Sequence, residues 1–547
     1  MKTIFKPLGL AAAVAGVTAG YAGVAAATST SIGQLGDLGI IPYYTVRDNW
    51  VTGVHIINSS DNTQVVKLRL RRGSDSADAL DFNLIMSPKD EWTGFIDDST
   101  GALAFSTEDK TCTAPIRADG VFPMPGIFRA GADEGYIEVI GMGEIGSNYP
   151  IARAAKHGSN GVPANCAAVA SNFFANLNAA TGADPSKKGN LGNAVTHQSA
   201  TAAEVAAFVS AGNTCLTPSG NVQSGPSFVA GVCQNVYQDA DNVLKVSYFF
   251  RDATAGTEIG GNATHIADFS DQPWMTNQET GLFSGDVFGF DYPDLDGGPF
   301  LPVPGPGALA LRFQYNSLRA GNVLGVSSVL NDWSVASARN VSTDWVVTMP
   351  GQYTMIDYVT WAAGAGLNFD NCATLDDPST AGDSSIAACD FRDIPVTADL
   401  TLYDREEQEI LPEDGDLVIS PAPPGTTNTL IFPYEVNVVQ WSDGNPPVLP
   451  SVYQTTVDPS VLGEFGWASL AVESTDDWVQ RVCQIRSGTT KWDNAPALAP
   501  NSAQAPLCIS ATGNVPVIGF AAWQRSFPSN PAANYGRSVD HSFTTSY

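Results

Sequence analysis

The chain has 547 residues, and its 56 acidic side chains outnumber its 27 basic ones to give a formal net charge of -29. This length is enough for about two to four domains with sizeable cores. The acidic balance argues against nucleic acid as a partner, because a phosphate backbone needs a basic face, and it favours a soluble acidic surface over cation binding.

The first 27 residues have the pattern of a secretory signal peptide. Lys2 and Lys6 form a positive end, an apolar stretch rich in Ala, Leu, Val and Gly follows, and small residues at 24–27 suit cleavage near Ala27. The alternative is a membrane helix that stays in place. No later stretch approaches the roughly 18–20 apolar residues that span a bilayer as a helix, so we expect an exported chain without a helical anchor.

Strand patterns dominate the first half of the mature chain. Segments that alternate in polarity or are rich in β-branched residues, bounded by turn residues, are 51–60, 63–73, 135–143 and 242–252. Residues 150–235 differ, being rich in Ala, Asn and Ser, and Thr201 with Glu204 forms a capping box for a helix over 201–212. We expect a first β-sandwich domain over 32–300 that carries a partly helical insertion at 150–235.

An acidic loop follows these strands. The stretch 284–300 combines carboxylates with consecutive glycines, the kind of flexible, oxygen-rich loop that binds calcium, although the EF-hand spacing is absent. The candidate calcium ligands are Asp286, Asp291, Asp294 and Asp296. The alternative is a solvated acidic segment that leads into the Pro- and Gly-rich linker 297–308.

The second half repeats the pattern of short strands and turns. Its predicted strands are 308–317, 344–349, 397–404, 428–441, 466–474 and 515–524. Many short strands separated by Gly, Pro, Asn and Asp favour antiparallel sandwiches, so we predict a mainly β protein of tandem Ig-like β-sandwich units. The second unit covers 308–547, with a candidate division at 421–427.

The chain contains eight cysteines and no CxxC motif, which in an exported protein favours structural disulfides over zinc or redox chemistry. Proximity along the chain favours three pairs and leaves a fourth: Cys215–Cys233, Cys372–Cys389, Cys483–Cys508 and then Cys112–Cys166. We expect each bridge to stabilise the fold by about 2–4 kcal/mol.

Tryptophan follows aspartate by one or two positions five times, at Trp50, Trp92, Trp333, Trp345 and Trp478. In a carbohydrate site, such a ring would lie in solvent and stack on a sugar while the carboxylate bonds hydroxyls. We favour a structural interpretation, in which the aspartate bonds its own backbone in a turn and the tryptophan enters the sheet as a core anchor. This interpretation predicts a buried Trp345, with Asp344 in the turn before it.

No motif forms a coherent catalytic set. Gly141, Gly143 and Gly146 match GxGxxG, but the residues up to Pro150 are poorly suited to open a helix, so a glycine turn after a strand is the better interpretation. The five histidines lack metal-ligand spacing, and no GxSxG elbow occurs. We therefore favour a protein that is not an enzyme and has no cofactor other than the candidate calcium.

Four phrases are spread along most of the mature chain: LGIIPYYTVRDNWVTGVHIINSS, ALDFNLIMSPKDEWTGFI, STDWVVTMPG and VPVIGFAAWQ with the later NYG. Together they resemble a family of exported bacterial proteins described as cell surface proteins. The resemblance implies an exported location and a β-rich build. It assigns no functional residues.

These features predict a non-enzymatic, exported cell-surface or extracellular protein with a structural, adhesive or matrix role. The expected partners are surface polysaccharide, other envelope proteins or further copies of the chain. One alternative is a carbohydrate-binding or polysaccharide-active protein, suggested by Trp beside Asp. The other is an outer-membrane β-barrel, suggested by the aromatic Tyr547 at the end and opposed by 35 prolines and eight cysteines.

Overall fold

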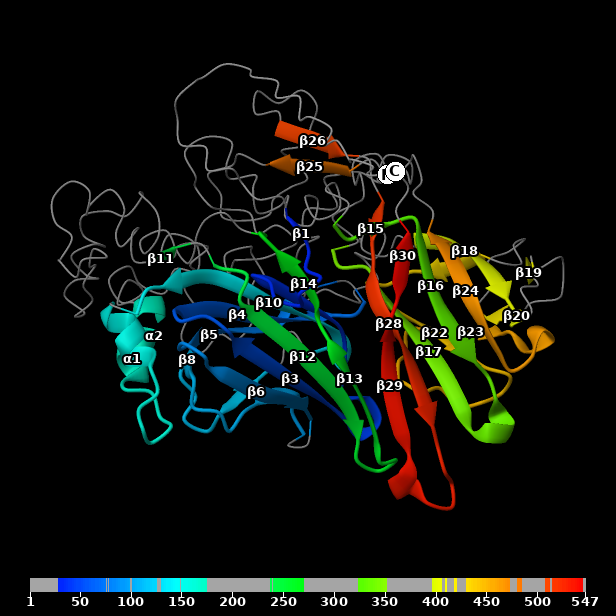
Figure 1. Cartoon of the computed structure of the whole chain (residues 1–547), viewed down its shortest axis with the longest axis horizontal. Coiled ribbons are helices and arrows are strands. Elements are labelled where there is room, and N and C mark those ends of the chain that lie inside the picture. Colours follow the sequence, from blue (N-terminus) through cyan, green and yellow to red (C-terminus); the bar gives the residue numbers. More distant parts are fainter. Residues whose placement is uncertain are drawn as a thin grey trace, which may run out of the picture.

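The chain is mainly β, and its strands form two sandwiches that lie side by side (Figure 1). The structure is a computed structural model that describes residues 28–74, 76, 78–98, 101–124, 129–147, 149–174, 237–238, 240–269, 323–351, 396–405, 409–410, 418–420, 429–472, 480–484, 507–511 and 514–544. The predicted signal peptide, the strand 308–317 and both proposed boundary segments, 297–308 and 421–427, lie outside these residues.

The first sandwich is built from the strands before residue 270. One sheet runs β1 (Ser29–Thr30), β14 (Thr264–Ala267), β2 (Leu38–Thr45), β10 (Glu134–Ile145), β4 (Thr63–Arg72), β5 (Asp78–Met86) and β8 (Cys112–Ala114), with β11 (Tyr237–Gln238) also paired to β10. The other runs β13 (Thr257–Asn262), β12 (Leu244–Asp252), β3 (Trp50–Asn58), β6 (Glu91–Asp97), β7 (Ala104–Ser106) and β9 (Val121–Pro123). The strand pairs are antiparallel, as predicted.

Two short helices lie at one end of this sandwich, α1 (Pro150–Ala155) and α2 (Cys166–Phe174). Pro150 occupies the first turn of α1. Backbone N–H groups in the first turn have no acceptor within the helix, so the N–H that proline lacks costs no helical hydrogen bond. Cys112 of β8 is bonded to Cys166 with 5.1 Å between their Cα atoms, which confirms that predicted disulfide and ties α2 to the sheet edge. The predicted helix over 201–212 lies outside the described residues.

The second sandwich uses the strands after residue 322. Its outer sheet runs β19 (Glu409–Ile410), β18 (Val396–Tyr403), β24 (Phe465–Val472), β16 (Ser328–Ser334) and β30 (Ser542–Thr544), with β21 (Thr429–Phe432) also on β18. Its inner sheet runs β20 (Val418–Ser420), β23 (Gln454–Asp458), β22 (Val436–Trp441), β17 (Val341–Thr348), β28 (Ile518–Arg525) and β29 (Tyr535–Asp540). Two small ribbons pair β15 (Gly325–Val326) with β27 (Val515–Pro516), and β25 (Gln480–Gln484) with β26 (Leu507–Ala511).

Two details of the second sandwich correct the expected strand pattern. The predicted strand 428–441 is divided into β21 and β22, because Pro433 between them cannot donate a ladder hydrogen bond. In addition, β22 and β23 are parallel, an exception to the antiparallel prediction. The connection 442–453 is long enough to return the chain so that β23 begins beside the start of β22.

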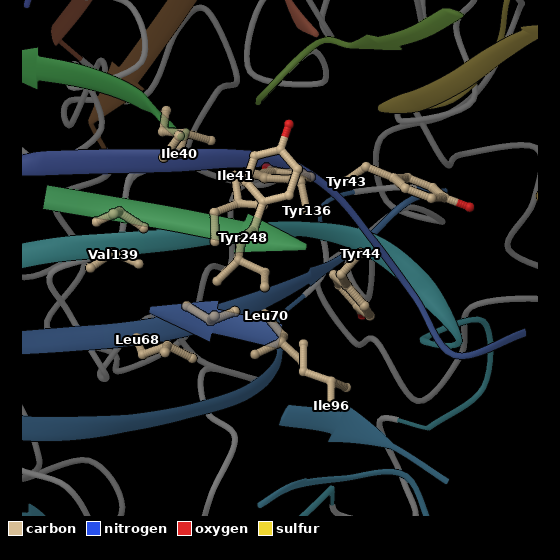
Figure 2. Packing of buried hydrophobic residues seen from close by; sticks show 14 of the residues in the cluster. Ile40, Ile41, Tyr43, Tyr44, Leu68, Leu70, Ile96, Tyr136, Val139 and Tyr248 are labelled. Atoms are coloured by element: carbon tan, nitrogen blue, oxygen red, sulfur yellow. The ribbon is translucent and has the colours of Figure 1, made fainter. Parts of the chain in front are cut away.

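One hydrophobic cluster joins the two sandwiches. In β17, Trp345 and Val347 face the interior of the second sandwich, whereas Val346 between them packs into the core of the first. Phe520 of β28 likewise enters the first core, with its ring centroid 5.9 Å from that of Phe250. The central strand β17 of the inner sheet is therefore buried on both faces over most of its length. Figure 2 shows the aliphatic and tyrosine side chains that pack in this cluster around β2, β4 and β10.

Buried polar contacts fix the same junction. The Glu134 carboxylate accepts hydrogen bonds from the Tyr43 hydroxyl at 3.0 Å and Arg47 Nε at 2.7 Å within the first sandwich. It also accepts one from the backbone N–H of Val452, in the second, at 3.0 Å. A buried carboxylate requires such partners, and here the donors come from both sandwiches, which fixes their relative placement.

Candidate functional site

The tryptophans of the Asp–Trp stretches are core residues wherever the structure describes them. Trp92, Trp333 and Trp345 are fully buried and Trp50 is 6% exposed, while Trp478 lies outside the described residues. The prediction of a buried Trp345 is confirmed. These rings are closed to a sugar, so the carbohydrate interpretation fails at these four positions.

The prediction for Asp344 was wrong. Asp344 lies within β17 and is fully buried, and its Oδ2 accepts hydrogen bonds from the backbone N–H groups of Val448 and Leu449, each at 2.8 Å. Burial raises the pKa of this carboxyl to about 7. The side chain faces the connection 442–453, so it bonds that segment and not its own turn. Asp332 likewise lies inside its strand, β16, so the predicted turn position is wrong there too. By contrast, Asp48 and Asp90 do precede their strands.

Among the described residues, an exposed tryptophan lies in a different segment. Trp467 of β24 is 39% exposed, and its ring stacks on that of Tyr403 in β18 with 3.9 Å between centroids and 8° between planes. On the other side of β24, Asp332 of β16 is the register partner of Trp467. Three adjacent strands therefore bring a carboxyl residue, an indole and a phenol into one row on the outer sheet. We call this row the aromatic row.

Charged groups lie at one end of the aromatic row. Phe465, two residues before Trp467, has the guanidinium carbon of Arg405 at 4.6 Å and that of Arg339 at 5.4 Å from its ring centroid. Arg339 also lies 3.8 Å from a carboxylate oxygen of Glu464. These cation–π contacts hold long side chains beside the aromatic rings.

A serine, a histidine and an aspartate meet in the first sandwich, but not as a catalytic relay. Nδ1 of His157 lies 3.2 Å from the Ser87 hydroxyl and 3.7 Å from Oδ2 of Asp90. A relay needs the serine at one ring nitrogen and the carboxylate at the other, whereas here both face the same nitrogen. The contact instead joins the segment after α1 to the turn between β5 and β6.

The glycine motif is structural. Gly141 and Gly143 lie inside β10 at a shift in the β4 register, and the N–H of Gly141 donates to the carbonyl of Asp37 at 2.7 Å. Two expectations for this motif were wrong: Gly141 and Gly143 lie within the strand and not in a turn after it, and a short helix, α1, does open at Pro150. A dinucleotide site needs the first glycines in the turn between strand and helix, and here they lie inside β10.

The remaining site predictions are only partly covered by the described residues. The proposed calcium ligands Asp286, Asp291, Asp294 and Asp296 and the cysteines Cys215, Cys233, Cys372 and Cys389 lie outside the described residues. Cys483 and Cys508 are direct register partners in β25 and β26, and their disulfide stays a prediction. Within the described ranges, no group of three or more His, Cys, Asp or Glu could hold a metal, and no helix has the length and apolar character to cross a membrane.

Sequence reasoning placed 466–474 in a strand but did not single out Trp467. A usable signal was present, because alternation in β24 puts Trp467 on the face opposite the apolar Ala468, Leu470 and Val472. A tryptophan on the polar face of an alternating strand is a candidate for binding. In comparisons with family models, curated proteins and solved structures, the chain shows no match.

Proposed function

We propose that this chain is an exported, non-enzymatic cell-surface protein that adheres to polysaccharide through the aromatic row. The observation that carries the proposal is the exposed Trp467 ring, stacked on Tyr403 and next in register to Asp332. Sugars bind proteins by presenting apolar C–H faces to such rings while their hydroxyls bond carboxylates and other polar groups.

The setting of Trp467 favours binding without large ordering costs. The indole stands on a strand in the middle of its sheet, and the Tyr403 ring covers one of its faces. Both restraints limit the rotamers of Trp467 before a ligand arrives, so little side-chain entropy remains to be lost on binding. A rigid aromatic anchor of this kind is typical of binding surfaces.

Export is supported by separate features. The first 27 residues have the pattern of a signal peptide, and the Cys112–Cys166 disulfide suits an oxidising compartment. The resemblance to exported bacterial cell surface proteins points the same way. The adhesive role is favoured over an enzymatic one because the Ser87–His157–Asp90 cluster lacks relay geometry.

The test is a polysaccharide array probed with the purified mature chain, with Trp467→Ala as the variant. We expect Trp467→Ala to lower affinity at least about tenfold, or ~1.4 kcal/mol, because it removes the stacking surface. The matched control is Tyr535→Ala, which removes another exposed ring, from β29 on the inner sheet, and should bind as the wild type does. Equal binding by Trp467→Ala and the wild type would overturn the proposal.

A further inference from the structure

The outer sheet continues beyond the aromatic row as a face of mostly small and polar side chains, with no further aromatic ring among its outward positions in β16, β18 and β24. In β24, Trp467, Ser469 and Ala471 point outward, and the residues between them belong to the core. The neighbouring strands alternate in the same way, so their outward positions lie beside those of β24. The outward residues beyond the aromatic row, here named the floor, are Ser328, Leu330, Asp399, Thr401, Ser469 and Ala471.

The register arranges the floor in two further rows. Leu330, Ser469 and Thr401 form the row next to Trp467. Ser328, Ala471 and Asp399 form the row after it. The floor thus extends across three strands, and the larger side chains of the aromatic row lie at one end of it.

The floor is long enough for more than one sugar ring. Trp467 and Ala471 are four residues apart, and a strand that rises about 3.4 Å per residue separates them by roughly 14 Å. A single pyranose ring stacked on Trp467 would leave the floor empty. A chain that extends from that ring along β24 would cover it.

The chemistry of the floor favours a neutral ligand. Its polar groups are hydroxyls and the carboxyl of Asp399, which accepts a hydrogen bond from the Thr429 hydroxyl at 2.7 Å. Asp332 adds a second carboxyl in the aromatic row, and no Lys or Arg lies among these outward positions. Carboxylates accept hydrogen bonds from sugar hydroxyls and repel a polyanion. The nearby cations, Arg339 and Arg405, lie at Phe465, on the side of Trp467 away from the floor.

From this arrangement we infer that the aromatic row and the floor together bind an extended, neutral β-1,4-linked glycan. One sugar ring stacks at Trp467, and the chain then runs along β24 over Ser469 and Ala471. A ribbon-like β-1,4 chain fits a flat face, whereas a coiled glycan would contact it at one point. This inference rests on the proposed adhesive function and specifies the ligand of the same site.

The experiment is isothermal titration of the full mature chain with cello-oligosaccharides from disaccharide to hexasaccharide, with tetragalacturonate as the anionic probe. We expect affinity to rise about tenfold or more from disaccharide to tetrasaccharide in the wild type. Ala471→Arg, which raises a long side chain on the floor, should abolish that rise and leave disaccharide binding unchanged. Ala471→Ser, which keeps the floor flat, should bind as the wild type does, and thermal unfolding checks that both variants fold.

The outcomes separate this inference from the proposed function. If affinity does not depend on chain length, or if its rise with length persists in Ala471→Arg, the inference that the floor binds glycan is wrong. The proposal that Trp467 binds a sugar ring is unaffected by that result. If tetragalacturonate binds more tightly than cellotetraose, only the inference that the glycan is neutral is wrong. If no cello-oligosaccharide or galacturonate binds while the array shows Trp467-dependent binding of another glycan, the ligand class is wrong. If no glycan binds in either experiment, the proposed function falls as well.

Discussion

Replacing Asp344 by asparagine tests how the Asp–Trp stretch of β17 is built. The carboxyl is fully buried, and its Oδ2 receives two backbone hydrogen bonds, from Val448 and Leu449. Desolvation outweighs these bonds and raises the pKa from its ordinary value of 3.8 to about 7. The asparagine side chain would keep a carbonyl oxygen for the two N–H groups and would carry no titrating proton.

The raised pKa fixes the sign and size of the effect. The folded state holds the Asp344 proton more tightly than the unfolded state. The contribution of Asp344 to the unfolding free energy is therefore complete below pH 3.8 and is lost as pH rises through about 7. The shift corresponds to ~4 kcal/mol of unfolding free energy. The stability of Asp344→Asn relative to wild type should therefore rise by about that amount between pH 4 and pH 8.

The assay is urea unfolding of both proteins across this pH range, followed by tryptophan fluorescence. Only the difference between variant and wild type is used, since other groups titrate in both. Asp48→Asn removes a charge from an exposed aspartate before β3 and controls for net charge. A difference for Asp344→Asn that stays constant across pH would refute the buried, proton-holding carboxyl.

Three further predictions concern stability. Phe520→Ala should lower the unfolding free energy by about 3–5 kcal/mol and leave a single calorimetric transition, because this ring from the second sandwich fills the core of the first. Replacing Cys112 and Cys166 together by alanine should cost about 2–4 kcal/mol, measured by urea unfolding against the oxidised wild type. Burial lowers the pKa of His541 from 6.5 to about 4, so its contribution to the unfolding free energy is present above pH 6.5 and lost as pH falls towards 4. The loss of stability with falling pH, followed by circular dichroism, should therefore be less steep in His541→Gln than in the wild type.

The strands could be predicted because their alternation is local. The segments 51–60, 63–73 and 135–143 correspond to β3, β4 and β10, where turn residues bound apolar or alternating runs. The burial of Trp345 followed from the same reasoning, since a large ring entering a sheet is most stable in its core.

Features set by long-range packing could not be predicted in this way. Within β17, Asp344 and Val346 face away from the core of their own sandwich, and nothing near them in the sequence indicates what covers that face. The aromatic row is likewise non-local, because Asp332, Tyr403 and Trp467 come from strands far apart in the chain. Only the register of the folded sheet brings them together.

Immunolabelling of intact producing cells tests the surface-adhesion proposal most directly, with the wild type compared with Trp467→Ala and with Tyr535→Ala as the control. We expect the wild type and Tyr535→Ala to label at the surface of unpermeabilised cells, and Trp467→Ala to be folded but to shift into the culture medium. Labelling that appears only after permeabilisation would contradict export, and equal retention of Trp467→Ala would contradict adhesion through the aromatic row.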